Sequence, residues 1–142
     1  MVPNTTTLAY LAGFFDGEGC ITIGKFTNKR TGNLEYGLTV ETTQCNPEPL
    51  WTMKMLFGGY VGIKQSTNTG YKRLYRHQAG RRKARYFLES LLPYLIVKRE
   101  EALVALEFCD LYDQKRKFLT DEILEKREIY RNRLSLLKKK EF

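Results

Sequence analysis

The sequence predicts an α+β domain in which helices cover one face of a four-stranded antiparallel sheet. Two observations predict this class. Four segments alternate apolar and polar residues with a period of two, and the other segments repeat apolar residues with the period of a helix. The chain has 142 residues, the length of a single domain spanning 1–142 that can bury a core. Because each strand has only one apolar face, we expect the other face of the sheet to meet something polar.

The N-terminal half contains two helices and a strand pair. We expect the first helix over Thr6–Phe15, with Thr5 or Thr6 as its N-cap. Two strands follow, joined by turn chemistry at residues 31–33, and they span Cys20–Lys29 and Glu35–Gln44. Asn46-Pro47 opens a second helix that runs to about Phe57 and ends at Gly58-Gly59.

The second strand pair spans Tyr60–Ser66 and Tyr71–Gln78. Alternation predicts that Val61 and Ile63 face inward beside Leu74, and that Lys64, Arg73 and Tyr75 face the other side. A helical stretch from Arg81 is interrupted and restarted at Pro93, and a last helix covers about Thr120–Lys138. The predicted order is therefore α-β-β-α-β-β-α-α.

The charge balance points to a polyanionic partner. The chain has 24 Lys and Arg against 16 Asp and Glu, a net charge of +8, so a two-fold dimer would carry +16. Such a surplus favours nucleic acid first and an anionic membrane surface second. No apolar run approaches the roughly 18 residues of a membrane span. Charge alone also leaves a merely soluble basic protein as an open interpretation.

The rare residues exclude several classes. Cys20, Cys45 and Cys109 are odd in number and form no CxxC pair, so we expect reduced thiols in an intracellular protein. The N-terminus lacks the pattern of a signal peptide. A single histidine, His77, excludes a His-rich metal cluster and the nucleases built on one. We expect His77 to be a strand residue.

A basic, tyrosine-containing run predicts DNA binding. From Lys64 to Tyr86 there are eight basic residues and no acidic ones, and a phosphate backbone would relieve their repulsion. A solvated basic edge strand is the alternative for any one of them. Polar residues on the other strands can read base edges in a major groove. The predicted contacts are Thr22, Gly24, Phe26, Asn28, Lys29, Arg30, Asn33, Glu35, Gly37, Thr39, Glu41, Thr43, Lys64, Ser66, Asn68, Tyr71, Arg73 and Tyr75.

The first helix has a face of small residues. Ala9, Gly13 and Gly17 are spaced four apart, and each glycine inside a helix costs about 1 kcal/mol relative to alanine. Close packing of another backbone offsets that cost, and a second copy of the same helix on a two-fold axis is a natural partner. The predicted dimer interface comprises Ala9, Leu11, Ala12, Gly13, Asp16 and Gly17. A tight crossing within one chain is an equal alternative.

Glu18 stands where this helix ends. A two-fold axis along paired helices would bring Glu18 of both copies together, and divalent cations would relieve the repulsion between the two carboxylates. A Mg²⁺ site needs only one or two protein carboxylates plus water and phosphate oxygens. From spacing alone, a capping or turn role for Asp16 and Glu18 is equally favoured.

The segment Leu11 to Gly19, LAGFFDGEG, resembles the motif of the LAGLIDADG homing endonucleases. The resemblance covers about Leu8 to Leu137 and implies that family's αββαββα fold. One motif copy implies the homodimeric branch. The resemblance further implies a site-specific endonuclease that makes double-strand breaks in a long, pseudo-palindromic target by metal-dependent hydrolysis, leaving short 3′ overhangs. It also implies an intron-encoded protein of an organelle or microbe.

The resemblance implies roles for individual residues. Glu18 and the Gly17 carbonyl would bind Mg²⁺ or Mn²⁺, with Ca²⁺ as a non-catalytic substitute. Gln44 would hold the water network, and Lys98 would stabilise phosphate charge or position the attacking water. Asp16 would be structural. Lys117 lies in a basic loop that would touch the DNA backbone, although a solvated loop is an equal alternative.

The sequence departs from the family's pattern at one place, and one alternative function stays open. Some homodimeric relatives carry a basic residue just after the glutamine that ends the second strand, whereas here Cys45-Asn46-Pro47-Glu48 follows Gln44. The alternative function is an intron RNA-splicing maturase or a non-cleaving DNA-binding protein of the same fold. The retained Glu18, Gln44 and Lys98 favour catalysis, and only the maturase would need RNA as a partner.

Overall fold

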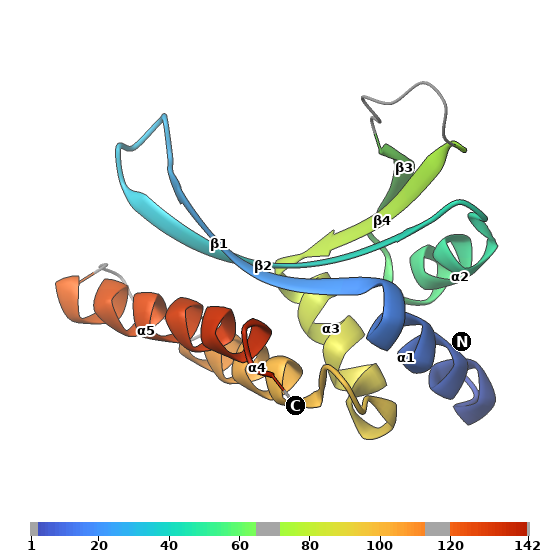
Figure 1. The fold of residues 1–142 in the computed structure, drawn as a ribbon. Coiled ribbons are helices and arrows are strands. Elements are labelled where there is room, and N and C mark those ends of the chain that lie inside the picture. Colours follow the sequence, from blue (N-terminus) through green and yellow to red (C-terminus); the bar gives the residue numbers. More distant parts are fainter. Residues whose placement is uncertain (1–2, 65–71, 113–119, 142) are drawn as a thin grey trace.

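The computed structural model describes residues 3–64, 72–112 and 120–141. Four strands form one antiparallel sheet in the order β1-β2-β4-β3, and they are β1 (Gly19–Thr27), β2 (Leu34–Gln44), β3 (Tyr60–Lys64) and β4 (Leu74–Gly80). The helices are α1 (Thr5–Glu18), α2 (Glu48–Phe57), α3 (Arg81–Leu91), α4 (Arg99–Tyr112) and α5 (Asp121–Lys138), with the short 3₁₀ helix η1 (Leu92–Tyr94) after α3. The helices lie on one side of a curved sheet, and both hairpins rise away from them (Figure 1). The predicted α+β class is confirmed.

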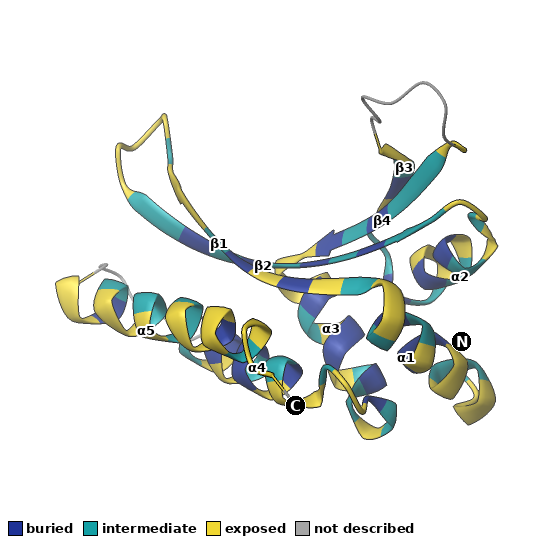
Figure 2. Ribbon diagram, in the orientation of Figure 1, coloured by how far each residue is buried: buried dark blue, intermediate teal, exposed yellow. Residues whose placement is uncertain are grey.

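The core lies where the sheet meets the helices, as Figure 2 shows. Positions of β1 and β2 alternate as predicted, so that Ile21 and Val40 are buried while Thr22 and Thr39 are not. Phe15 and Phe57 both pack edge-on against Phe87, with ring centroids 4.9 and 5.0 Å apart. Apolar burial of this kind stabilises the fold by roughly 25 cal/mol per Å² of apolar surface removed from water. It therefore decides which face of the sheet the helices cover.

Helix α1 is longer than predicted at both ends. Asn4, rather than Thr5 or Thr6, is the N-cap, and its Oδ1 accepts a hydrogen bond from the Thr7 N–H at 2.8 Å. The helix then continues past Phe15 to Glu18, because Gly17 is helical despite its low propensity. Glu18 is therefore the last helical residue, at the junction of helix and strand as predicted, and β1 begins at Gly19, one residue before the predicted Cys20.

Two glycines end α2 and bring it against β4. Gly58 and Gly59 have φ of +78° and +97°, which side chains rarely adopt. A Cβ at Gly59 would lie 2.5 Å from the carbonyl oxygen of Gln78. The buried His77 ring donates through Nε2 to the Gly58 carbonyl at 2.8 Å and stacks on Phe87. His77 is thus a strand residue of the core, as expected.

The second hairpin and Pro93 depart from the prediction. Strand β4 begins at Leu74 and extends to Gly80, beyond the predicted Gln78, and Tyr71 lies outside the described residues. Ile63 pairs with Tyr75 but is 58% exposed, because β3 is an edge strand of the sheet. Pro93 lies in η1, and the next helix begins only at Arg99.

Helix α5 is tied to the first hairpin. Thr120 caps it by accepting from the Ile123 N–H at 3.3 Å. Tyr36 of β2 donates to Glu128 at 2.6 Å, and Lys25 of β1 lies 3.3 Å from the same carboxylate. Burial and this carboxylate together raise the pKa of Tyr36 to about 12. In the part of the chain that the structure describes, neither α5 nor any other helix is long and apolar enough to span a bilayer.

His77 makes stability depend on pH. Burial lowers its pKa below the ordinary 6.5, so at pH 5 to 6.5 the folded chain binds fewer protons than the unfolded chain. Stability is then fully present above about pH 6.5 and falls with decreasing pH, by up to about 1.4 kcal/mol per pH unit. Replacing His77 by Gln keeps a donor but removes the titration. Urea unfolding between pH 5 and 7.5 should show a shallower pH dependence for His77→Gln, and equal slopes would contradict this assignment.

Candidate nucleic-acid interface and metal centre

The face of the sheet away from the helices is open and polar. Along β1 and β2 it carries side chains from two ladder rows that pair Thr22 with Thr39 and Phe26 with Glu35. Nine predicted contacts lie on this face: Thr22, Gly24, Phe26, Glu35, Gly37, Thr39, Glu41, Thr43 and Lys64. Asn28, Lys29, Arg30 and Asn33 lie in the hairpin turn, and Arg73 is exposed just before β4. Ser66, Asn68, Tyr71 and Lys117 lie outside the described residues.

The predicted orientation of β4 is wrong by one residue. Tyr75 shares its face with buried His77 and Ala79 and packs partly buried against the core, so it does not lie on the open face. Arg76 and Gln78 take that place instead. The prediction followed Tyr71, Arg73 and Tyr75 from the start of the segment. The signal that it missed is the equally regular apolar series Tyr75, His77 and Ala79.

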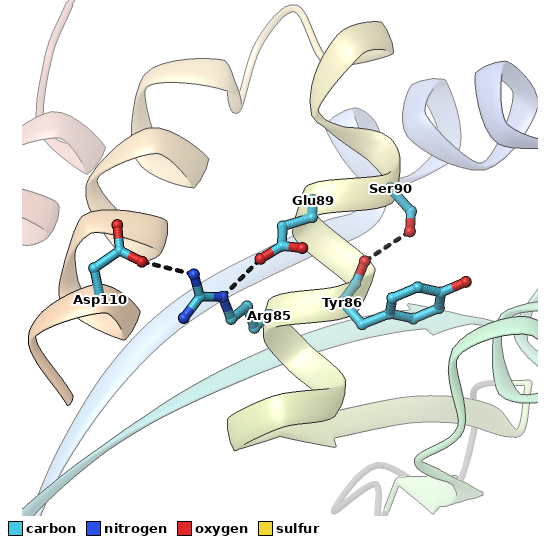
Figure 3. A network of polar contacts seen from close by, with 5 residues as sticks. All are labelled: Arg85, Tyr86, Glu89, Ser90 and Asp110. Atoms are coloured by element: carbon cyan, nitrogen blue, oxygen red, sulfur yellow. Dashed lines mark hydrogen bonds and ion pairs between the residues drawn. The ribbon is translucent and has the colours of Figure 1, made fainter. Parts of the chain in front are cut away.

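The basic run is less uniform than its sequence indicates. Arg85 lies 2.6 Å from Glu89 of its own helix and 2.6 Å from Asp110 of α4, as Figure 3 shows. Tyr86 packs edge-on against Phe57, with ring centroids 5.6 Å apart. Both residues therefore join α3 to its neighbours. The charge at Arg85 is compensated within the chain, and our expectation of an uncompensated run is corrected at that position.

The small-residue face of α1 is exposed and has no partner in the described chain. Ala9, Gly13 and Gly17 are exposed, and a Cβ at either glycine would meet nothing within 4 Å. A tight crossing within the described chain is therefore excluded. The interface prediction is wrong for Leu11 and Ala12, which are fully buried in the core of their own chain. Tyr10, which follows Ala9 of this face, is 58% exposed.

Asp16 fixes the end of α1 to the loop before α4. Its carboxylate accepts the backbone N–H groups of Ile96 and Lys98 at 2.9 and 3.0 Å. The Lys98 ammonium in turn donates to the Asp16 carbonyl at 2.8 Å. The carboxylate of Asp16 is directed at its own chain, which is the structural role that the resemblance implies. Its inclusion in the dimer interface has no support from these contacts.

The candidate catalytic residues lie on elements that meet at this end of α1. Glu18 is exposed and, among the described residues, has neither an ion pair nor a hydrogen bond. Gly19 pairs with Thr42, so Gln44 at the end of β2 lies two residues beyond that pair. Gln44 Oε1 accepts from the Cys45 N–H at 2.7 Å, which leaves its amide hydrogens for another partner. Lys98 reaches the same helix end through Asp16.

The oxygen ligands at this end of α1 are too few to bind a divalent cation by themselves. The described residues contain no group of three or more His, Cys, Asp or Glu side chains that could bind a metal. Glu18 supplies one carboxylate at the C-terminal end of a helix, where the macrodipole favours positive charge. Mg²⁺ accepts one or two carboxylates completed by water and phosphate oxygens. Glu18 and the Gly17 carbonyl fit such a site when a second copy and a nucleic acid add ligands.

The family is decided by a match that covers most of the chain. The family model described as LAGLIDADG endonuclease matches residues 11–99, which include the α1 motif, the whole sheet, α3 and Lys98. The chain belongs to the LAGLIDADG endonuclease family. No curated protein matches it significantly.

Several solved structures share the fold. The archaeal intron-encoded homing endonuclease I-Vdi141I, complexed with DNA, is 20% identical with a TM-score of 0.76, over 96% of this chain and 87% of that one. I-CvuI, bound to the I-CreI target with Mg, is 19% identical with a TM-score of 0.75, over 93% and 82%. I-SmaMI is 23% identical with a TM-score of 0.66, and the match covers 95% of this chain but only 46% of that one.

Because Asp16 accepts two backbone hydrogen bonds and Glu18 accepts none from the described residues, we expect their replacement to affect stability differently. Asp16→Asn should lower the free energy of unfolding by about 2 kcal/mol, since hydrogen bonds to a charged group are each worth about 1.5–3 kcal/mol. Glu18→Gln, at an exposed and unpartnered acid, should change it by less than about 0.5 kcal/mol. Chemical denaturation of both variants tests this. Equal changes in the free energy of unfolding would show that the hydrogen bonds of Asp16 do not stabilise the fold.

Proposed function

We propose that this LAGLIDADG protein is a homodimeric, site-specific DNA endonuclease that uses Mg²⁺. One observation carries the proposal: among the described residues, Glu18 has no partner, and neither does the small-residue face of the helix that it ends. Pairing that face with a second copy brings two Glu18 side chains together between two open polar sheets. The net charge of +8 per chain supports a polyanionic substrate.

The bare face of α1 supports the dimer. Helices approach most closely where residues lack side chains, and Gly13 and Gly17 leave backbone exposed over one turn. Tyr10 flanks this face and stacks on Phe14, with centroids 6.3 Å apart, so it can cover the rim of the contact. A symmetric contact of this kind is self-complementary and closes as a pair.

The site residues have distinct proposed roles. Glu18 and the Gly17 carbonyl hold the metal, which would supply charge stabilisation and a water of lowered pKa when bound. The Gln44 amide holds the attacking water through the hydrogens that its bond to Cys45 leaves free. The Lys98 ammonium, placed by the Asp16 carbonyl, has further protons that can neutralise phosphate charge. Water attacks phosphorus in line with the 3′ oxygen, which leaves 5′-phosphate and 3′-hydroxyl ends with short 3′ overhangs.

Removing the Glu18 charge tests catalysis separately from binding. Glu18→Gln should abolish cleavage of a randomised duplex library in Mg²⁺ and still retain DNA, because the amide keeps the size of the side chain but weakens metal binding. Sequencing of cut ends and a gel-shift assay measure the two properties. The wild-type protein is the positive control, and full cleavage by the variant would overturn the proposal. Retention of a selected sequence without cleavage by the wild type would favour the non-cleaving alternative.

Blocking the face of α1 tests the dimer. Gly13→Leu should leave the monomer folded, since the Cβ meets nothing within 4 Å, but should prevent close approach of two helices. We expect a monomer in sedimentation velocity and at least a 100-fold loss of double-strand cleavage, a free-energy cost of about 2.8 kcal/mol or more. Ser135→Leu adds the same side chain to an exposed position on α5 as a control. A Gly13→Leu protein that stays dimeric places the interface elsewhere.

A further inference from the structure

Arg76 occupies a central position on the open face of the sheet. It lies in β4, an inner strand, between Thr43 of β2 and Gly62 of β3 in the ladder. Gly62 contributes no side chain, and the ring of Tyr60 lies over it so closely that a Cβ there would collide. Arg76 is therefore flanked by a short hydroxyl side chain and an aromatic ring, and it is only partly exposed.

The guanidinium of Arg76 has no partner among the described residues. Its Nε is buried without a hydrogen-bond partner, and no described residue forms an ion pair with the side chain. The acid in the next ladder row, Glu41, is occupied by the Lys64 ammonium at 3.3 Å. Desolvating a charged group without a partner is costly, and a guanidinium presents five donors in a rigid plane. The Nε atom itself is shielded from solvent, so an acceptor from outside the chain would bind the terminal N–H groups of this partly exposed side chain and stabilise its charge.

The position of Arg76 favours a base over a phosphate as that acceptor. A sheet face that lies in a major groove brings its central residues to the base edges, and its hairpins and rim to the phosphates. Guanine offers O6 and N7 side by side, which match the two parallel donors of an arginine. Arg76 pairs with Thr43 of β2, and the neighbouring residue Thr42 pairs with Gly19, the residue that follows Glu18. Two strand spacings, about 10 Å, separate the backbones of β4 and β1 here, so Arg76 lies towards the end of β1 that follows Glu18.

We propose that Arg76 reads one guanine in each half-site of the DNA target, on the side of the half-site nearer the cleavage position. This specificity role rests on the proposed function, in which the open sheet face binds DNA. In this role Arg76 determines which base the protein prefers and takes no part in catalysis. The dimer would repeat the contact, so the preference should occur twice, symmetrically about the centre of the target.

Selection from a randomised duplex library tests the proposal. The parent is Glu18→Gln, which prevents cutting during selection, and Arg76→Ala and Arg76→Lys are each added to it. Both should lose a guanine preference of about 10- to 100-fold at one symmetric pair of positions, with the other positions unchanged. Lysine keeps the charge but lacks the planar fork, so it separates base reading from electrostatics. Arg133→Ala, which removes the same charge from exposed α5, should leave the profile unchanged.

The outcomes separate the two proposals. If the parent selects no sequence, the proposed function fails. If the parent selects a sequence and Arg76→Ala lowers affinity equally for every sequence, with a salt slope reduced by about 1, Arg76 contacts a phosphate and our inference is overturned. An unchanged profile in both Arg76 variants overturns it as well. Circular dichroism and the retained specificity at all other positions establish that each variant is folded.

Discussion

The fixed end of α1 is the constraint on which the rest of the site depends. Asp16 accepts two backbone N–H groups from the loop before α4, and Lys98 returns a hydrogen bond to the Asp16 carbonyl. These bonds hold a helix end against a loop 80 residues away in sequence. Glu18 follows two residues later and continues into β1, which is paired with β2. The carboxylate that a metal would need thus emerges from a frame fixed on both sides.

The two faces of the sheet differ in where their side chains find partners. Apolar side chains hold the helices to one face, and ion pairs such as Arg85 with Asp110 join the helices to one another. The other face uses few of its polar groups internally, apart from pairs such as Lys64 with Glu41 and Asn28 with Glu35. Arg76, which has no partner among the described residues, is compatible with this face in the proposed DNA complex, where its acceptor comes from outside the chain.

Most of the architecture could be predicted from the sequence, because alternation and helical periodicity directly reflect which side of each element is buried. The motif at Leu11 to Gly19 located Glu18 correctly at the junction of helix and strand. Alternation does not fix its own starting point, however, so Tyr75 was assigned to the wrong face and Arg76 was overlooked. Leu11 and Ala12 share the motif with Gly13, but only packing reveals that they point into their own core.

The bare glycines of α1 have a thermodynamic consequence in the proposed dimer. Each costs the isolated helix about 1 kcal/mol relative to alanine, and no contact within the described chain compensates for it. Only association returns that free energy, so the folded state would be stabilised by mass action as chains accumulate. The protein would then be most vulnerable to unfolding and proteolysis when it is scarce. A nuclease built this way has its lifetime, as well as its activity, governed by its own abundance.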